Sequence, residues 1–181
     1  ITRNSSYSNV VLDNKYVSRI SAFLVDGEID DSPRTLHRNS GISNIGSIVM
    51  GMGFTFEEGV PDEASSILKM NEVLKASEAE RVFVKPYLGG YELNNNLCSL
   101  PDRFVIDFGG LSLDEARRVA PNLMNIVEIK VKPYRDKLKK AQYREKWWLH
   151  GERQQSLYEK MGALKRALAT CRVSPNLNFT F

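Results

Sequence analysis

Two carboxylates and a lysine in this 181-residue chain have the spacing of a metal-dependent nuclease site. Pro101-Asp102 precedes Glu128-Ile129-Lys130, and the glutamate follows the aspartate by twenty-six positions. In nucleases with this PD-(D/E)xK pattern the carboxylates hold a divalent metal ion and the lysine steadies the attacking water. The pattern requires Glu128 on a strand, whereas its neighbours predict a helix. A small metal-dependent nuclease using Asp102, Glu128 and Lys130 is therefore one alternative.

A second metal-binding pattern has no supporting context. Asp107-Phe108-Gly109 resembles the metal-binding triplet of protein kinases. No glycine-rich loop, no HRD triplet and no suitable lysine accompany it. We therefore expect Asp107 to end a strand and the chain to turn at Gly109 and Gly110.

Histidines and cysteines offer no catalytic or metal-binding arrangement. His37 and His150 are the only histidines, and neither has a serine, cysteine or metal-ligand partner at a recognisable spacing. Cys98 and Cys171 do not form a CxxC pair, so we expect free thiols rather than a zinc site. The sequence thus predicts no catalytic, cofactor-binding or metal-binding residue.

Positive charge is concentrated in the last quarter of the chain. Residues 130–172 hold thirteen Lys/Arg and four Asp/Glu, a net charge of +9, whereas the rest of the chain carries −6. Such segregation suits a polyanionic partner. A solvated basic helix face would give the same pattern, and a scaffold whose basic helix docks an acidic protein partner is the other alternative.

Basic and aromatic residues alternate between positions 130 and 148. Basic side chains bind phosphates and fix register, and aromatic side chains can stack on bases or pack against the duplex. For Trp148 we favour a role as a core anchor. The residues are Lys130, Lys132, Tyr134, Arg135, Lys137, Lys139, Lys140, Tyr143, Arg144, Lys146, Trp147 and Trp148.

The elements that must position these residues mix strands and helices without a regular βαβ rhythm. The pattern therefore predicts an α+β fold with a mainly antiparallel sheet and packed helices. Ser112 and Glu115 form a capping box, and Pro133 should kink or divide the helix that contains it. Expected strands are 16–25, 47–52, 80–87, 103–108, 167–173 and 178–181; expected helices are 61–79, 123–140 and 155–166.

The ends and the hydropathy suggest an excised piece of a cytoplasmic protein. Residues 1–15 are polar and predict a loose arm, and the segment 26–46 predicts a loop. No membrane span and no signal peptide are recognisable. The first residue is Ile1 rather than Met, which suggests a fragment.

Six blocks taken in order resemble the target-recognition region of single-chain, type IIG/IIL-like restriction–methyltransferases and phage-defence adenine methyltransferases. An upstream piece, ISAFLVDG (20–27), is similar to the strand that enters this region. The blocks are SIVMGMGFTF (47–56), VFVKPYLGGYELN (82–94), DRFVIDFGGLSLDEA (102–116), IVEIKVKPYRDK (126–137), YREKWWLHGERQQSLY (143–158) and ALATCRVSPNLNF (167–179).

This resemblance implies a DNA target-recognition domain at 46–181, preceded at 1–45 by an arm and entry strand from a methyltransferase core. Members of the family methylate adenine in restriction–modification systems with S-adenosylmethionine, through an NPPY motif and a glycine-rich loop. Neither motif occurs here. The resemblance thus implies a non-catalytic fragment without a cofactor, with double-stranded DNA and the methyltransferase core as partners.

By position, the resemblance places base-reading side chains in two groups. The first group is Lys139, Lys140, Gln142 and Arg144, and the second is Arg172, Ser174, Asn176 and Asn178. The alternation of the second group suits one face of a strand or extended loop. Arginine can bond guanine through two hydrogen bonds, and asparagine can do the same with adenine. The full expected DNA-contacting set is Lys130, Lys132, Arg135, Lys137, Lys139, Lys140, Gln142, Tyr143, Arg144, Lys146, Trp147, Arg172, Ser174, Asn176 and Asn178.

Overall fold

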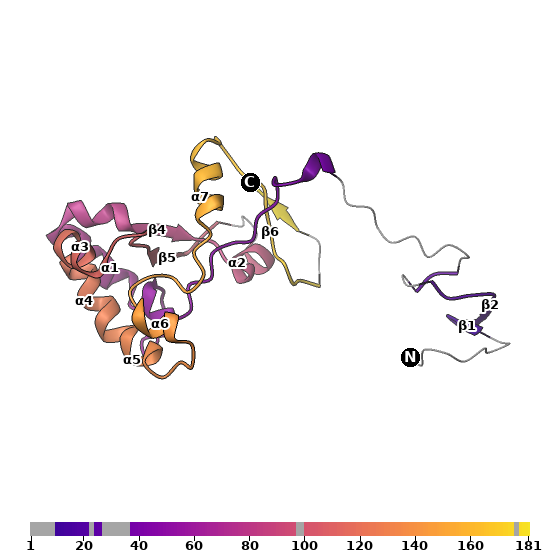
Figure 1. The fold of residues 1–181 in the computed structure, drawn as a ribbon, viewed down its shortest axis with the longest axis horizontal. Helices are drawn as coiled ribbons and strands as arrows, with labels where there is room; N and C mark the ends of the chain where they lie inside the picture. Colours follow the sequence, from indigo (N-terminus) through magenta and orange to yellow (C-terminus); the bar gives the residue numbers. More distant parts are fainter. Residues whose placement is uncertain (1–9, 22–23, 27–36, 97–99, 176–177) are drawn as a thin grey trace. The chain divides into compact units, whose positions relative to one another are not determined.

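The computed structural model describes residues 10–21, 24–26, 37–96, 100–175 and 178–181 (Figure 1). Asn176 and Cys98, and parts of the expected arm and loop, lie outside these ranges. The chain divides into two compact units, Ile1–Ser43 and Asn44–Phe181. Each unit is described by itself below.

The first unit contains a small hairpin. Strands β1 (Val10–Leu12) and β2 (Lys15–Val17) pair antiparallel, with Leu12 opposite Lys15. Asp13 and Asn14 form the turn with positive φ angles of 49° and 61°, which Asp and Asn tolerate better than most residues. Part of the expected arm is therefore a strand. Of the strand expected at 16–25, only its first two residues lie in β2.

A three-stranded antiparallel sheet forms the centre of the second unit. Its order is β3 (Thr55–Phe56), β5 (Arg103–Ile106) and β4 (Val84–Tyr87), with β5 in the middle. The strand expected at 103–108 is confirmed in its first four residues. The strand expected at 80–87 begins only at Val84, because Glu78–Phe83 form a 3-10 helix.

Local capping signals define the helices near the sheet. Ser66 caps α1 (Ile67–Ala76) by accepting a hydrogen bond from the Lys69 amide at 3.1 Å. The predicted capping box of Ser112 and Glu115 is present at the start of α3 (Leu113–Val119). Helix α1 is shorter than the expected helix 61–79, since residues 61–64 form turns and a bend and Ser65 pairs with Phe56 before the cap.

Proline positions divide the helix that the pattern predicts at 123–140. Helix α4 (Pro121–Lys130) has Pro121 at its first turn, and α5 (Lys132–Arg135) follows, with Pro133 in its own first turn. A third short helix, α6 (Ala141–Glu145), comes after a loop. Proline lacks an amide hydrogen, so Pro133 fits the beginning of a new helix better than the interior of a long one.

The core lies between the sheet and these helices. Phe54, Phe56 and Ile106 from the sheet side and Leu123 and Val127 from α4 are fully buried in one cluster. Figure 1 shows α1, α3 and α4 grouped beside the sheet. Their apolar faces therefore hold α4, and the basic segment that follows it, against the strands.

Two further helices and a hairpin complete the second unit. Helix α2 (Gly90–Asn95) occupies a stretch in which we expected only turns. Helix α7 (Gln155–Gly162) is shorter than the expected helix 155–166, and the hairpin of β6 (Ala169–Thr170) and β7 (Phe179–Thr180) is shorter than the two expected strands.

Residues 47–52, before the sheet, do not form the expected strand. They cross closely over the segment around Glu152 instead. Ile48 forms an isolated antiparallel bridge with Glu152, and a 3-10 helix, Met52–Phe54, follows. A Cβ atom on Gly53 would lie 2.7 Å from Lys130 Cβ, so glycine allows this turn to contact the end of α4.

The arrangement is α+β, with small antiparallel sheets and packed helices, as the pattern predicts. Within the described residues, no helix has both the length and the apolar character needed to cross a membrane.

Candidate nucleic-acid interface

Residues 136–146 form a basic segment on the surface, made of the loop after α5 and helix α6. Lys137, Lys139, Lys140 and Lys146 are all exposed there. Arg144 closes the loop, because its Nη1 atom donates to the carbonyl oxygens of Leu138 at 2.6 Å and Lys139 at 2.9 Å. Arg144 is thus partly used to shape the loop, although its side chain is exposed.

Several cations of the basic segment have no carboxylate partner among the described residues. The Lys140 ammonium lies over the Tyr143 ring, 5.3 Å from its centroid. Within the described parts of the chain, Lys137, Lys139 and Lys146 make no side-chain ion pair. Gln142 is exposed on α6. This arrangement offers strongly hydrated point charges to an anion without first breaking a salt bridge.

Three residues of the expected DNA-contacting set are in the interior. Arg135 is fully buried, Tyr143 is 7% exposed and Trp147 is 5% exposed. We therefore take these three out of the candidate set, since their side chains pack inside the unit. The alternation of basic and aromatic residues in the sequence does not indicate which of these side chains are buried and which face the solvent.

The Arg135 guanidinium is held by backbone carbonyls instead of a carboxylate. Its Nη2 atom donates to the carbonyl oxygens of Val49 at 2.9 Å and Leu149 at 3.0 Å. Its central carbon lies 5.7 Å from the Phe54 ring centroid and 5.3 Å from that of Tyr143. Burial lowers the pKa of Arg135 below its ordinary value, but an arginine remains protonated.

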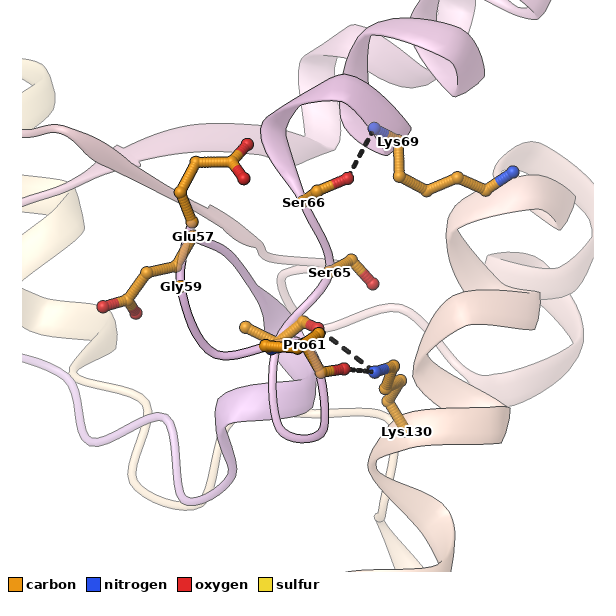
Figure 2. Close-up of a pocket in the computed structure, with 9 residues that line it drawn as sticks. Glu57, Gly59, Pro61, Ser65, Ser66, Lys69 and Lys130 are labelled. Carbon is orange, nitrogen blue, oxygen red and sulfur yellow. Dashed lines mark hydrogen bonds between the residues drawn. The ribbon is translucent and has the colours of Figure 1, made fainter.

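Lys130 is also used inside the fold. Figure 2 shows its side chain crossing from α4 to the loop at Pro61, where Nζ donates to the carbonyl oxygens of Pro61 at 2.5 Å and Ala64 at 3.1 Å. The lysine lines a cavity of about 440 Å³ together with Glu57, Ser66 and other residues of this loop. These contacts stabilise the loop rather than leave the charge free.

Lys132 has a nearby carboxylate. Its Nζ atom bonds Asp136 Oδ2 at 2.7 Å, one helical turn along. Because both side chains are about half exposed, this pair contributes little to stability. Lys132 remains a candidate for phosphate contact, but it must compete with its own ion pair.

The nuclease alternative does not match the geometry. Glu128 lies on α4 and not on a strand, and its carboxylate pairs with Arg117 at 3.2 Å. The Lys130 ammonium is engaged by backbone carbonyls, as described above. Within the described residues, no group of three His, Cys, Asp or Glu side chains could hold a metal ion. We therefore set aside Asp102, Glu128 and Lys130 as a nuclease site.

The second group of expected base-reading residues lies around α2. Ser174 Oγ donates to Asn94 Oδ1 at 2.8 Å, and the Asn178 side-chain amide donates to the Leu93 carbonyl oxygen. Arg172 is exposed, and Asn176 lies outside the described residues. Residues 172–175 connect β6 to β7 and are not a strand, so the alternation that placed four side chains on one face does not apply.

The two expected groups therefore belong to different parts of the unit. The basic segment packs against α5 through Tyr143 and Arg135, whereas the C-terminal hairpin packs against α2. Figure 1 draws α6 and β6 well apart. Trp148 takes the expected structural role, because it is partly buried and its indole Nε1 donates to the Leu111 carbonyl oxygen at 3.0 Å.

Two buried carboxylates that the sequence did not predict position the helices. Glu80 accepts hydrogen bonds from the Asn122 side chain at 2.7 Å and the Leu123 amide at 2.9 Å, and so caps α4. Glu92 bonds Arg103 and the Gly89 amide. The partners of Glu80 are more than forty positions away, and so no local pattern could have indicated this cap.

The Glu92–Arg103 pair is tightly coupled. Burial alone would raise the pKa of Glu92, but hydrogen bonds from Arg103 and from the amides of Glu92 and Gly89 outweigh burial and lower it. The hydrogen bond to the Glu92 carboxylate raises the pKa of Arg103 against its own desolvation, and the charges of Glu92 and Glu57 act in the same direction. This pair joins α2 to β5 and so supports the surface on which the C-terminal hairpin packs.

Comparison with known proteins gives one structural likeness. No model of a protein family matches the chain, and no curated protein sequence matches it. The solved structure of the type IIL restriction-modification enzyme MmeI in complex with DNA is similar at 17% sequence identity, with a TM-score of 0.49. The likeness covers 76% of this chain, and the chain spans only 17% of the length of that enzyme.

Proposed function

We propose that this chain is a module that recognises a double-stranded DNA sequence, as part of an adenine-specific DNA methyltransferase or restriction–modification enzyme. One structural observation carries the proposal. The basic segment exposes Lys137, Lys139, Lys140 and Lys146 within eleven positions, and none of them is paired with a carboxylate in the described residues. The ordered sequence blocks, which resemble target-recognition regions, support the choice of DNA among polyanions.

In this proposal the lysines hold the duplex and a few other side chains read it. Lysine ammonium groups neutralise phosphates and fix the register of the protein on DNA, but they carry no sequence information. We propose that Gln142, exposed on α6, and Arg172, exposed after β6, contact base edges. We propose that the module itself transfers no methyl group and binds no cofactor, and that S-adenosylmethionine binds to a core elsewhere in the parent protein.

The salt dependence of duplex binding tests the proposal. Each phosphate contact contributes about 0.9 to the slope of log affinity against log salt concentration. We expect the double variant Lys139→Gln/Lys146→Gln to lower the affinity and to reduce this slope by about 1.8. Fluorescence anisotropy of a labelled duplex over a range of KCl concentrations measures both quantities.

A matched control separates local contacts from net charge. Lys75→Gln/Lys85→Gln removes the same charge from exposed positions on α1 and β4, and we expect its salt slope to equal that of the native chain. Equal slopes for both double variants would contradict a contact at the basic segment. Preferential competition by an acidic polypeptide over duplex DNA would instead favour a protein-docking scaffold.

A further inference from the structure

Arg135 connects three segments of the second unit although its side chain is fully buried. Its Nη2 atom bonds the carbonyl oxygens of Val49 and Leu149, which belong to two segments that cross at the Ile48–Glu152 bridge. The Val49 carbonyl also accepts a hydrogen bond from the Gly151 amide at 3.2 Å. Arg135 therefore holds α5, immediately before the basic segment, on this crossing.

A stack of rings and cations continues from Arg135 to the surface. The guanidinium faces the ring of Tyr143, which belongs to α6, and the Lys140 ammonium also lies against that ring at 5.3 Å. Both centroid distances are within the range of a cation–π attraction. Arg135 is thus packed together with Lys140, at the end of the loop, and with Tyr143 of α6.

A buried arginine in this arrangement is energetically unfavourable if its only role is to fill space in the core. The Nε and Nη1 atoms of Arg135 have no hydrogen-bond partner, and no carboxylate bonds the guanidinium in the described residues. Burial of an unpaired cation is unfavourable, and an apolar side chain of similar volume is often as stable or more stable. An apolar residue, however, could not bond two carbonyls and face two rings at the same time.

We propose that Arg135 is a positioning residue that holds the basic segment 136–146 in its binding conformation without touching DNA. The proposal rests on the function proposed above. A segment that is already ordered does not lose loop and side-chain entropy when it binds, so its lysines bind phosphates more tightly. Arg135 thus determines how well the exposed lysines work, while contributing no contact of its own.

Hydrogen exchange of the 181-residue chain tests the positioning role without DNA. In Arg135→Met we expect the amides of Leu138, Tyr143 and Lys146 to exchange at least about tenfold faster than in the native chain. Amides far from the segment, such as those of Ser77 and Met124, should keep their rates. Equal acceleration of all these amides would show a general structural role and overturn the proposal.

Duplex binding by the same variant tests the consequence for DNA. We expect the affinity of Arg135→Met to fall about tenfold at every salt concentration, with the salt slope unchanged, because no phosphate contact is lost. A slope reduced by about 0.9 would show that Arg135 itself contacts a phosphate and would overturn the proposal. Affinity and exchange rates that both stay within twofold of native values would also overturn it.

Two further variants keep the result interpretable. Arg117→Met removes one exposed cation that is paired with Glu128 on α3 and α4, and both measurements should stay at native values. If Arg135→Met does not fold, Tyr143→Leu removes the ring but keeps both carbonyl bonds, and selective acceleration of the same amides supports the proposal. If the native chain binds no duplex, the proposed function fails. Faster amide exchange confined to residues 136–146 in Arg135→Met would still show that Arg135 orders the basic segment.

Discussion

His150 shows at the scale of one residue how burial can make stability depend on pH. Its Nε2 atom donates to the Ile106 carbonyl oxygen at 2.8 Å, and its ring packs edge-on against Phe54 at 5.2 Å. Its Nδ1 atom has no hydrogen-bond partner among the residues that the structure describes. Burial is the main cause that lowers the pKa of His150, and the nearby Arg135 and Arg153 charges act in the same direction. The folded protein therefore favours the neutral ring.

The sign of the pH effect follows from this lowered pKa. The unfolded chain takes up a proton at His150 below about pH 6.5, the ordinary histidine value, while the folded chain does not. We expect the free energy of unfolding to be greatest above that pH and to decrease as the pH falls from there toward the lower folded pKa. Urea denaturation between pH 7.5 and 5.5 measures the decrease.

His150→Gln supplies the control for this titration. A glutamine amide can still donate to the Ile106 carbonyl but does not titrate, so the variant should lose less stability than the native chain over the same pH interval. An identical pH dependence in both proteins would contradict the role of His150. The pKa of the Glu92 carboxyl is also lowered. Its contribution to the free energy of unfolding is lost only below about pH 4.5, as the pH falls toward its folded pKa, and so does not affect this interval.

At the scale of the element, buried side chains distant in sequence determine where helix α4 begins. Pro121 and the Ala120 backbone start the helix, but Glu80 supplies the acceptor for the first amides. A carboxylate at the N-terminus of a helix also interacts favourably with the helix dipole. Because α4 carries the largest share of the helical core, this cap affects the whole second unit.

Glu80→Ala should therefore destabilise the protein strongly. The variant leaves the Leu123 amide without its acceptor in a buried site, whereas the exposed Asn122 side chain can bond water instead. We expect a loss of about 1–3 kcal/mol in the free energy of unfolding. Glu78→Ala, two positions earlier on the same 3-10 helix, removes only an exposed pair with Arg81 and should cost at most about 0.5 kcal/mol. Similar losses in the two variants would show that the cap is unimportant.

Local signals in the sequence predicted elements well where the determinants are adjacent. The capping box of α3 and strand β5 were found in this way, since their patterns lie within four to six residues. Helix α2 was missed because its stability depends on the pairing of Glu92 with Arg103, eleven positions later on β5. The 3-10 helix at Glu78–Phe83 was missed because Val82 and Phe83 favour a strand locally, whereas the structure buries Glu80 and exposes Val82.

At the scale of the whole molecule, the sequence predicted an α+β class and a segregated charge, but not which cations face the solvent. Composition places thirteen Lys/Arg in residues 130–172. Only the folded backbone shows that Arg135 points inward, that Lys130 bonds carbonyls, and that Lys139 and Lys146 remain exposed. Such assignments depend on long-range packing, which no spacing within the segment records.

The positions of Trp147 and Trp148 give the protein a built-in optical reporter. They are the only tryptophans of the chain, they directly follow the basic segment, and their rings meet edge-on at 6.1 Å. All indole emission therefore comes from this one place, 5% exposed at Trp147 and only partly buried at Trp148. We expect the emission wavelength or intensity to change when a duplex binds. Titration with unlabelled DNA would follow binding without any dye, and an unchanged spectrum at saturation would place the duplex elsewhere.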